Sequence, residues 1–110
     1  MADTEYEIII DELRGSEVEL VLTGDLSIDH AVKINDEMVQ QLNKSDIERI
    51  RLRDVVNIDL SVIQIIASIV KSKKQENKKI ELVNDIAGPL TDLLHKTGIE
   101  QMLLSISKEK

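Results

Sequence analysis

Two stretches in which aliphatic and charged residues alternate constrain the fold most. In residues 17–23 the aliphatic side chains alternate with glutamates, and in residues 48–53 they alternate with arginines. A period of two is typical of a β-strand with one buried and one solvated face. If these strands are neighbours, Glu and Arg pair across the outer face, contributing a few tenths to ~1 kcal/mol per pair. The buried face is then predicted to carry Val18, Leu20, Leu22, Ile50 and Leu52.

Two further strands are predicted, at residues 6–10 and 79–83. A polar connection with Gly15 as its turn residue joins the first of them to residues 17–23, and helical patterns separate the other strands. A helix over residues 28–42 is indicated by an apolar stripe at three- and four-residue steps, namely Ile28, Ala31, Ile34, Met38 and Leu42. A second helix, over residues 61–77, follows from a polar line with the same spacing, namely Ser61, Gln64, Ser68, Ser72 and Gln75. Ser27 is expected to cap the first helix, and the lysines of residues 71–79 are expected to form a solvated helix end.

The last part of the chain predicts a third helix and a short strand. Asn84 and Asp85 are expected to cap that helix, Pro89 lies in its first turn, and residues 99–106 form a possible terminal strand. Strands that alternate with helices favour a mixed, mostly parallel sheet of four or five strands. We therefore predict a single α/β domain over residues 1–110, with the helices gathered mainly on one face.

Composition narrows the classes of function. The 110-residue chain has a formal net charge of −7, which argues against nucleic acid or an anionic membrane surface as the partner. It has no cysteine, so disulfides and thiolate chemistry are excluded. No apolar run approaches the ~18 residues of a membrane span. The acidic N-terminus does not resemble a signal peptide, and we expect a cytoplasmic protein without membrane insertion.

Motifs that would indicate an enzyme are weak. His30 and His95 are solitary, no Gly-x-Ser-x-Gly elbow occurs, and the four glycines form no phosphate loop. The many carboxylates are scattered over predicted polar faces, where solvation explains them. We predict no catalytic residue, metal or cofactor, and a small enzyme stays a third hypothesis resting only on the carboxylates.

Asp59 and Ser61 open the second predicted helix and allow two interpretations. In the structural one, Asp59 caps the helix by accepting from the N–H of Ser61 or Val62, and Ser61 is a tolerated first-turn residue. In the functional one, Ser61 is a phosphorylation switch, because a helix N-terminus favours negative charge.

Over nearly its whole length the chain resembles the STAS domains of the anti-sigma factor antagonist family. The family's Gly-Glu-x-Asp turn, third strand and Asp-Ser-Ser-Gly helix opening correspond to Gly24-Asp25-Leu26-Ser27, to residues 50–58 and to Asp59-Leu60-Ser61-Val62. Ala31 follows the turn at the family's interval, and Leu82-Val83-Asn84 and Thr97-Gly98-Ile99 match the family's usual ending.

This resemblance implies a bacterial signalling protein in transcription regulation that binds a kinase-like anti-sigma factor. Ser61 would be the residue that the partner phosphorylates. The partner-binding surface would comprise Asp25, Ser27, Asn57, Asp59, Leu60, Gln64 and Ser68. Leu60 and Val62 replace the first Ser and the Gly of the motif, which favours a second hypothesis: a non-phosphorylated adaptor in a chemotaxis, signalling or lipid-transport assembly. The oligomeric state stays open.

Overall fold

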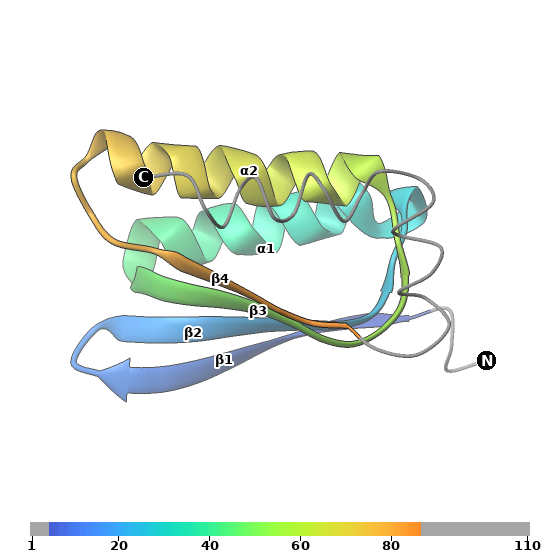
Figure 1. Ribbon diagram of the computed structural model, residues 1–110, viewed down its shortest axis with the longest axis horizontal. Coiled ribbons are helices and arrows are strands. Elements are labelled where there is room, and N and C mark those ends of the chain that lie inside the picture. The colour runs from blue at the N-terminus through green and yellow to red at the C-terminus, as the bar shows by residue number, and fades with distance from the viewer. Residues whose placement is uncertain (1–4, 87–110) are drawn as a thin grey trace.

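The computed structural model describes residues 5–86, which form four strands, a short 3-10 helix and two α-helices (Figure 1). Their order, β-β-α-β-α-β, is the predicted one. The third helix, Pro89 and the terminal strand of the prediction lie outside the described residues. The elements are β1 Tyr6–Arg14, β2 Glu17–Leu26, η2 Ile28–His30, α1 Ala31–Lys44, β3 Asp46–Ile58, α2 Leu60–Gln75 and β4 Glu81–Asp85.

The sheet is mixed and mostly parallel, as predicted. Its strand order is β1-β2-β3-β4, with β1 antiparallel to β2 and the other two pairings parallel. Gly15, at a φ of 60°, makes the turn between β1 and β2. Both α-helices lie on one face of the sheet and start at the same end of it, as Figure 1 shows. The predicted α/β class, with helices gathered on one face, is therefore confirmed for the described residues.

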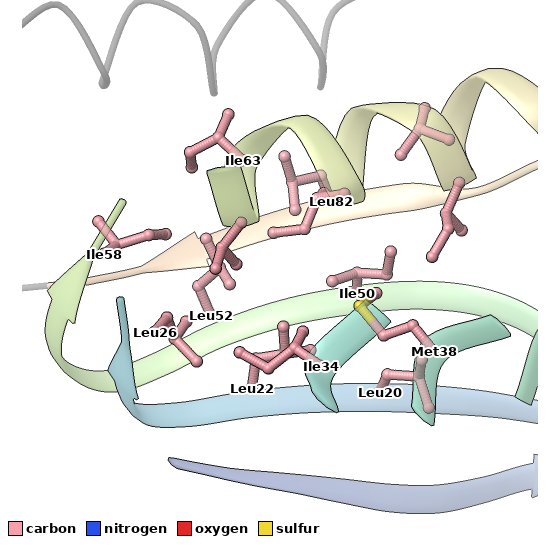
Figure 2. Close-up of a cluster of buried hydrophobic side chains, with 14 of the residues drawn as sticks. Leu20, Leu22, Leu26, Ile34, Met38, Ile50, Leu52, Ile58, Ile63 and Leu82 are labelled. Atoms are coloured by element: carbon pink, nitrogen blue, oxygen red, sulfur yellow. The ribbon is translucent and has the colours of Figure 1, made fainter. Parts of the chain in front are cut away.

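The core lies between the helices and the inner face of the sheet (Figure 2). The aliphatic positions of the alternating stretches supply the sheet's share of it, and Leu20, Leu22, Ile50 and Leu52 are wholly buried. On α1 the predicted stripe is confirmed at Ile34 and Met38, which are buried. It is wrong at Ile28, which is 65% exposed, because residues 28–30 form the separate helix η2 and turn that side chain outward.

The outer face of the sheet carries the predicted ladder of ion pairs. Arg49 bonds Glu19 at 3.0 Å on β2 and Glu81 at 3.0 Å on β4. Arg51 bonds the same Glu19 oxygen at 3.2 Å and also pairs with Asp85. Burial alone would raise the pKa of Glu19, but the hydrogen bonds from Arg49 and Arg51 outweigh it and hold that pKa below its usual range. The ladder thus joins three parallel strands.

The end of α2 corrects one prediction. Lys73, expected in a solvated helix end, is only 2% exposed and pairs with Asp46 at the start of β3. The pKa of Asp46 is lowered chiefly by that hydrogen bond. Beyond Lys73 the helix closes in a Schellman motif: Asn77, at a φ of 60°, donates to the Lys74 carbonyl, and Lys78 donates to the Lys73 carbonyl, both at 3.0 Å.

Candidate functional site

The parallel strands β2 and β3 end side by side and bring several predicted site residues together. Asp25 is paired in register with Asn57, and the N–H of Asp59 donates to the Leu26 carbonyl at 3.0 Å. The helices η2 and α2 then start immediately after these strands. We call this part of the molecule, residues 24–32 and 56–64, the Ser61 end.

Asp59 occupies the N-cap position of α2, as predicted, but its carboxylate accepts from different donors. One oxygen accepts from the N–H of Leu60 at 2.8 Å, and the other accepts from the hydroxyl of Ser61 at 3.2 Å. The N–H groups of Val62 and Ile63 instead donate to the Asp59 carbonyl, at 3.1 and 3.2 Å. The expected donor was therefore wrong, because the backbone carbonyl takes the first helical bonds and leaves the carboxylate to Leu60 and Ser61.

Asp25 is the centre of a second polar group at the Ser61 end. One of its carboxylate oxygens accepts from the Ser27 hydroxyl at 3.1 Å and lies 3.5 Å from Nε2 of His30. Ser27 stands before η2 but makes no side-chain cap, which corrects its predicted role: its hydroxyl is turned to Asp25 instead. The other Asp25 oxygen is buried and accepts no hydrogen bond within residues 5–86.

Gly24 lets the chain approach this group closely. Its φ is +88°, and a Cβ there would lie 2.3 Å from the carbonyl oxygen of Glu5. The N–H of Asp25 donates to the same oxygen at 2.8 Å. A glycine is thus required where the start of β1 meets the end of β2.

A contact between the rings of Tyr6 and His30, which was not predicted from the sequence, connects β1 with η2. The rings of Tyr6 and His30 lie 5.1 Å apart, and the Tyr6 hydroxyl donates to Glu37 on α1. Burial, together with the nearby Glu37 carboxylate, raises the pKa of Tyr6 to about 12. Tyr6 is the chain's one residue of the Phe, Trp and Tyr group, and this was the sequence signal that could have pointed to the contact.

The outward side of the Ser61 end mixes polar and apolar side chains. Gln64 and Ser68 are exposed along α2, Ser61 is half-buried, and Leu60 is 42% exposed. Val62 is fully buried and leaves the surface beside Ser61 open. Three further large apolar residues at this end are exposed, namely Ile28, Val32 and Val56. The Ser61 end thus exposes several large apolar side chains beside polar groups, and both kinds of side chain occur in protein-binding surfaces.

A group of three carboxylates lies at the opposite end of the sheet. Oxygens of Glu17, Asp46 and Glu48 fall within 4.8 Å of one another. Asp46 already bonds the ammonium group of Lys73, so a cationic side chain takes the place that a metal ion would need. We assign no metal site to this group.

Comparison with known proteins identifies the fold. No family model and no curated protein sequence matches the chain. Among solved structures, an anti-sigma factor antagonist from Mycobacterium paratuberculosis superimposes with a TM-score of 0.66 and 14% identity, covering 96% of this chain and 97% of that one. The chain has the fold of the anti-sigma factor antagonists.

Two other solved structures share this fold. The anti-sigma factor antagonist SpoIIAA in its unphosphorylated form matches with a TM-score of 0.62 and 11% identity, over 87% of this chain and 84% of that one. The murine anion transporter solute carrier 26 family member A9, in its inward-facing state, matches with a TM-score of 0.57 and 17% identity. That match covers 87% of this chain but 16% of the transporter. In the part of this chain that the structure describes, no helix has the length and apolarity needed to cross a bilayer.

Proposed function

We propose that this protein is a regulatory, non-enzymatic binding module of the anti-sigma factor antagonist type. It binds a kinase-like anti-sigma partner through the Ser61 end, and phosphorylation of Ser61 weakens that binding. The observation that carries the proposal is the position of the Ser61 hydroxyl: in the first turn of α2, half-buried, and beside the exposed Leu60. The shared fold supports it.

The contacts of Ser61 provide the mechanism of the switch. Its hydroxyl now donates to Asp59, whose other oxygen caps Leu60. A phosphate on Ser61 adds roughly −1.5 to −2 charges at pH 7 and has no proton to donate to Asp59. The hydrogen bond is replaced by like-charge repulsion, and the cap of α2 is displaced. A partner that contacts Leu60 and the start of α2 then meets a changed surface and an added charge.

The experiment is an intact-mass measurement after incubation with ATP and each kinase-like protein encoded in the same genome. A gain of one phosphate that is lost in Ser61→Ala supports the switch. Ser68→Ala, an exposed serine two turns further along α2, is the matched control and keeps the gain. Ser61→Ala is expected to retain partner binding. A folded Ser61→Ala protein that no longer binds contradicts the assigned role.

The second candidate function is a non-switching adaptor of the same fold. The engaged, half-buried state of the Ser61 hydroxyl favours it, because a kinase must first break the contact with Asp59. This function predicts a stable complex with a signalling or transport partner and no mass gain. Co-purification of such a complex, without phosphate on any serine, selects it over the switch.

A further inference from the structure

A second recessed surface lies at the opposite end of the sheet from Ser61. The turn between β1 and β2 and the connection from α2 to β4 both project past the start of β3 (Figure 1). Between them is a cleft of about 1020 Å³, close to the upper limit of ~300–1,000 Å³ for small-molecule sites. Its walls come from three separate segments: residues 13–17, 48–49 and 74–81.

The charge of this cleft is opposite to that of the whole protein. Five basic and three acidic side chains line it, although the chain's net charge is −7. Arg14 lies 3.7 Å from Glu17, Lys78 lies 3.5 Å from Glu76, and Arg49 is bonded to two glutamates, so these three side chains already have acidic partners. Within residues 5–86, neither Lys74 nor Lys79 forms an ion pair. Basic side chains outnumber acidic ones in this lining, and such a local excess on an acidic protein attracts anions.

Lysines often occur at a helix C-terminus because they complement the helix dipole, but this does not account for all the lysines of the cleft. Lys74 lies in the last turn of α2, where it complements the helix dipole. Lys79 lies four residues beyond the helix, past the dipole's range. The Schellman motif at Asn77 fixes the direction in which the chain leaves the helix, and the buried pair of Lys73 with Asp46 anchors the turn before it. The cleft's lysines are therefore carried by a well-held backbone.

The apolar part of the cleft limits what kind of anion it suits. Leu13, at the end of β1, is 44% exposed, and the half-buried Ile80 also lines the cleft. No aromatic ring is among the described lining residues, so the cleft offers no aromatic side chain to a nucleobase. A ligand that covers Leu13 and Ile80 while placing its charge between the lysines satisfies both features.

We propose that this basic cleft binds a small organic anion in which a carboxylate or phosphate group is joined to an aliphatic chain. The acid group contacts the ammonium groups of Lys74 and Lys79, and the chain lies on Leu13 and Ile80. The proposal is independent of the Ser61 end, because no lining residue of the cleft belongs to it.

The test is a titration followed in proton–nitrogen correlation spectra of the whole protein. Octanoate and octyl phosphate are the two probes of the acid group, inorganic phosphate lacks the chain, and octylammonium reverses the charge. Saturable shifts of the amides of residues 13–17 and 74–81 with octanoate or octyl phosphate are expected. Tighter binding of octyl phosphate assigns a phosphomonoester, and tighter binding of octanoate assigns a carboxylate.

Two variants and a matched control define the site. The double variant Lys74→Gln/Lys79→Gln is expected to weaken binding about fivefold, because it removes both ammonium groups that contact the acid group while solvent screens each contact. The control Lys33→Gln/Lys44→Gln removes the same charge from exposed positions on α1 and should change affinity less than about twofold. Leu13→Ser should weaken octanoate binding but leave inorganic phosphate unaffected.

Four results overturn the proposal. They are the absence of a saturable shift with either anionic probe, equal binding of octylammonium, equal binding of inorganic phosphate and octyl phosphate, and unchanged affinity in the lysine double variant. Circular dichroism of each variant separates a lost site from a lost fold.

Discussion

The two ends of the sheet are built from similar parts but are held by different means. Each end has a glycine at positive φ, Gly24 or Gly15, and each has an aspartate that holds one terminus of α2. At the Ser61 end, the carboxylate of Asp59 bonds only the first two residues of the helix. At the other end, which we call the Lys73 end (residues 13–17, 46–49 and 73–81), Asp46 bonds a lysine that is 2% exposed. A buried ion pair thus holds α2 at the Lys73 end, and more accessible hydrogen bonds hold it at the Ser61 end.

The largest expected loss of stability distinguishes Gly24 from Gly15. Gly24→Ala places a Cβ 2.3 Å from the Glu5 carbonyl oxygen at a φ of +88°, and we expect a loss of about 3 kcal/mol in the free energy of unfolding. Gly15→Ala, at a φ of +60° with no atom within 4 Å of the added Cβ, should cost about 1 kcal/mol. Urea unfolding of both variants measures the difference. Equal losses would show that the close approach of β1 to Gly24 is not tight in solution.

The next effect compares the two aspartates. Asp46→Ala leaves the buried ammonium group of Lys73 without its partner and is expected to cost about 2–4 kcal/mol. Asp59→Ala removes a helix cap and should cost about 1 kcal/mol. Thermal and urea unfolding give both values. If Asp59→Ala is the more damaging variant, the contrast between the two ends is wrong.

Acidic pH is expected to weaken the pair of Asp46 with Lys73 and the ion pairs of Glu19 on the outer face of the sheet. The pKa values of Asp46 and Glu19 lie below their usual range in the folded protein, so both groups bind protons more readily when unfolded. Their contribution is present at neutral pH and is lost as the pH falls below about 4, through their folded pKa values. The urea midpoint should therefore drop on acidification. Asp46→Asn should show a smaller drop than the parent, and an equal drop would assign the acid sensitivity elsewhere.

The smallest effect on stability is expected at Ser61 itself. Ser61→Asp places a second carboxylate beside Asp59 at the start of α2, where repulsion and the favourable helix dipole oppose each other. We expect a change within about 1 kcal/mol in unfolding, together with reduced partner binding in a pull-down. Gln40→Glu, which adds one negative charge at an exposed position on α1 outside the predicted partner-binding surface, is the control and should leave binding unchanged.

Periodicity predicted the strands and the buried inner face of the sheet well. The expected wet outer face is wrong on β2, where Glu19 is only 8% exposed and Val21 is fully buried. The pairing of Glu19 with Arg49 and Arg51 was expected from their opposite charges alone. The stripe on α1 failed at Ile28, since a 3-10 turn and a first α-helical turn carry similar residues but orient them differently. Local sequence patterns therefore predict which elements form and which of their faces are buried, but not the residue at which each element begins.

Contacts between segments far apart in the chain could not be predicted from the sequence. Lys73 continues the apolar line of Ile66, Ile69 and Val70, and this spacing was a signal that it faces inward. Its partner Asp46 lies at the start of another element, and only the fold brings the two together. The same holds for the basic cleft, whose residues come from three segments, and for the orientation of Ser27 toward Asp25. By contrast, Asp25, Asn57, Asp59 and Ser61 meet as expected, because parallel strands end at one edge of the sheet.

The outer ladder has a consequence for how the molecule opens. The five residues of β4 pair only with β3 among the described strands, and Arg49 and Arg51 tie them further through Glu81 and Asp85. These ion pairs lie on a solvated face, so added salt screens them while the core beneath is unaffected. Rising ionic strength should accordingly speed amide hydrogen exchange in β4 before it affects β2. The strand that closes this side of the sheet is then a separate, salt-sensitive opening unit rather than part of the globally protected core.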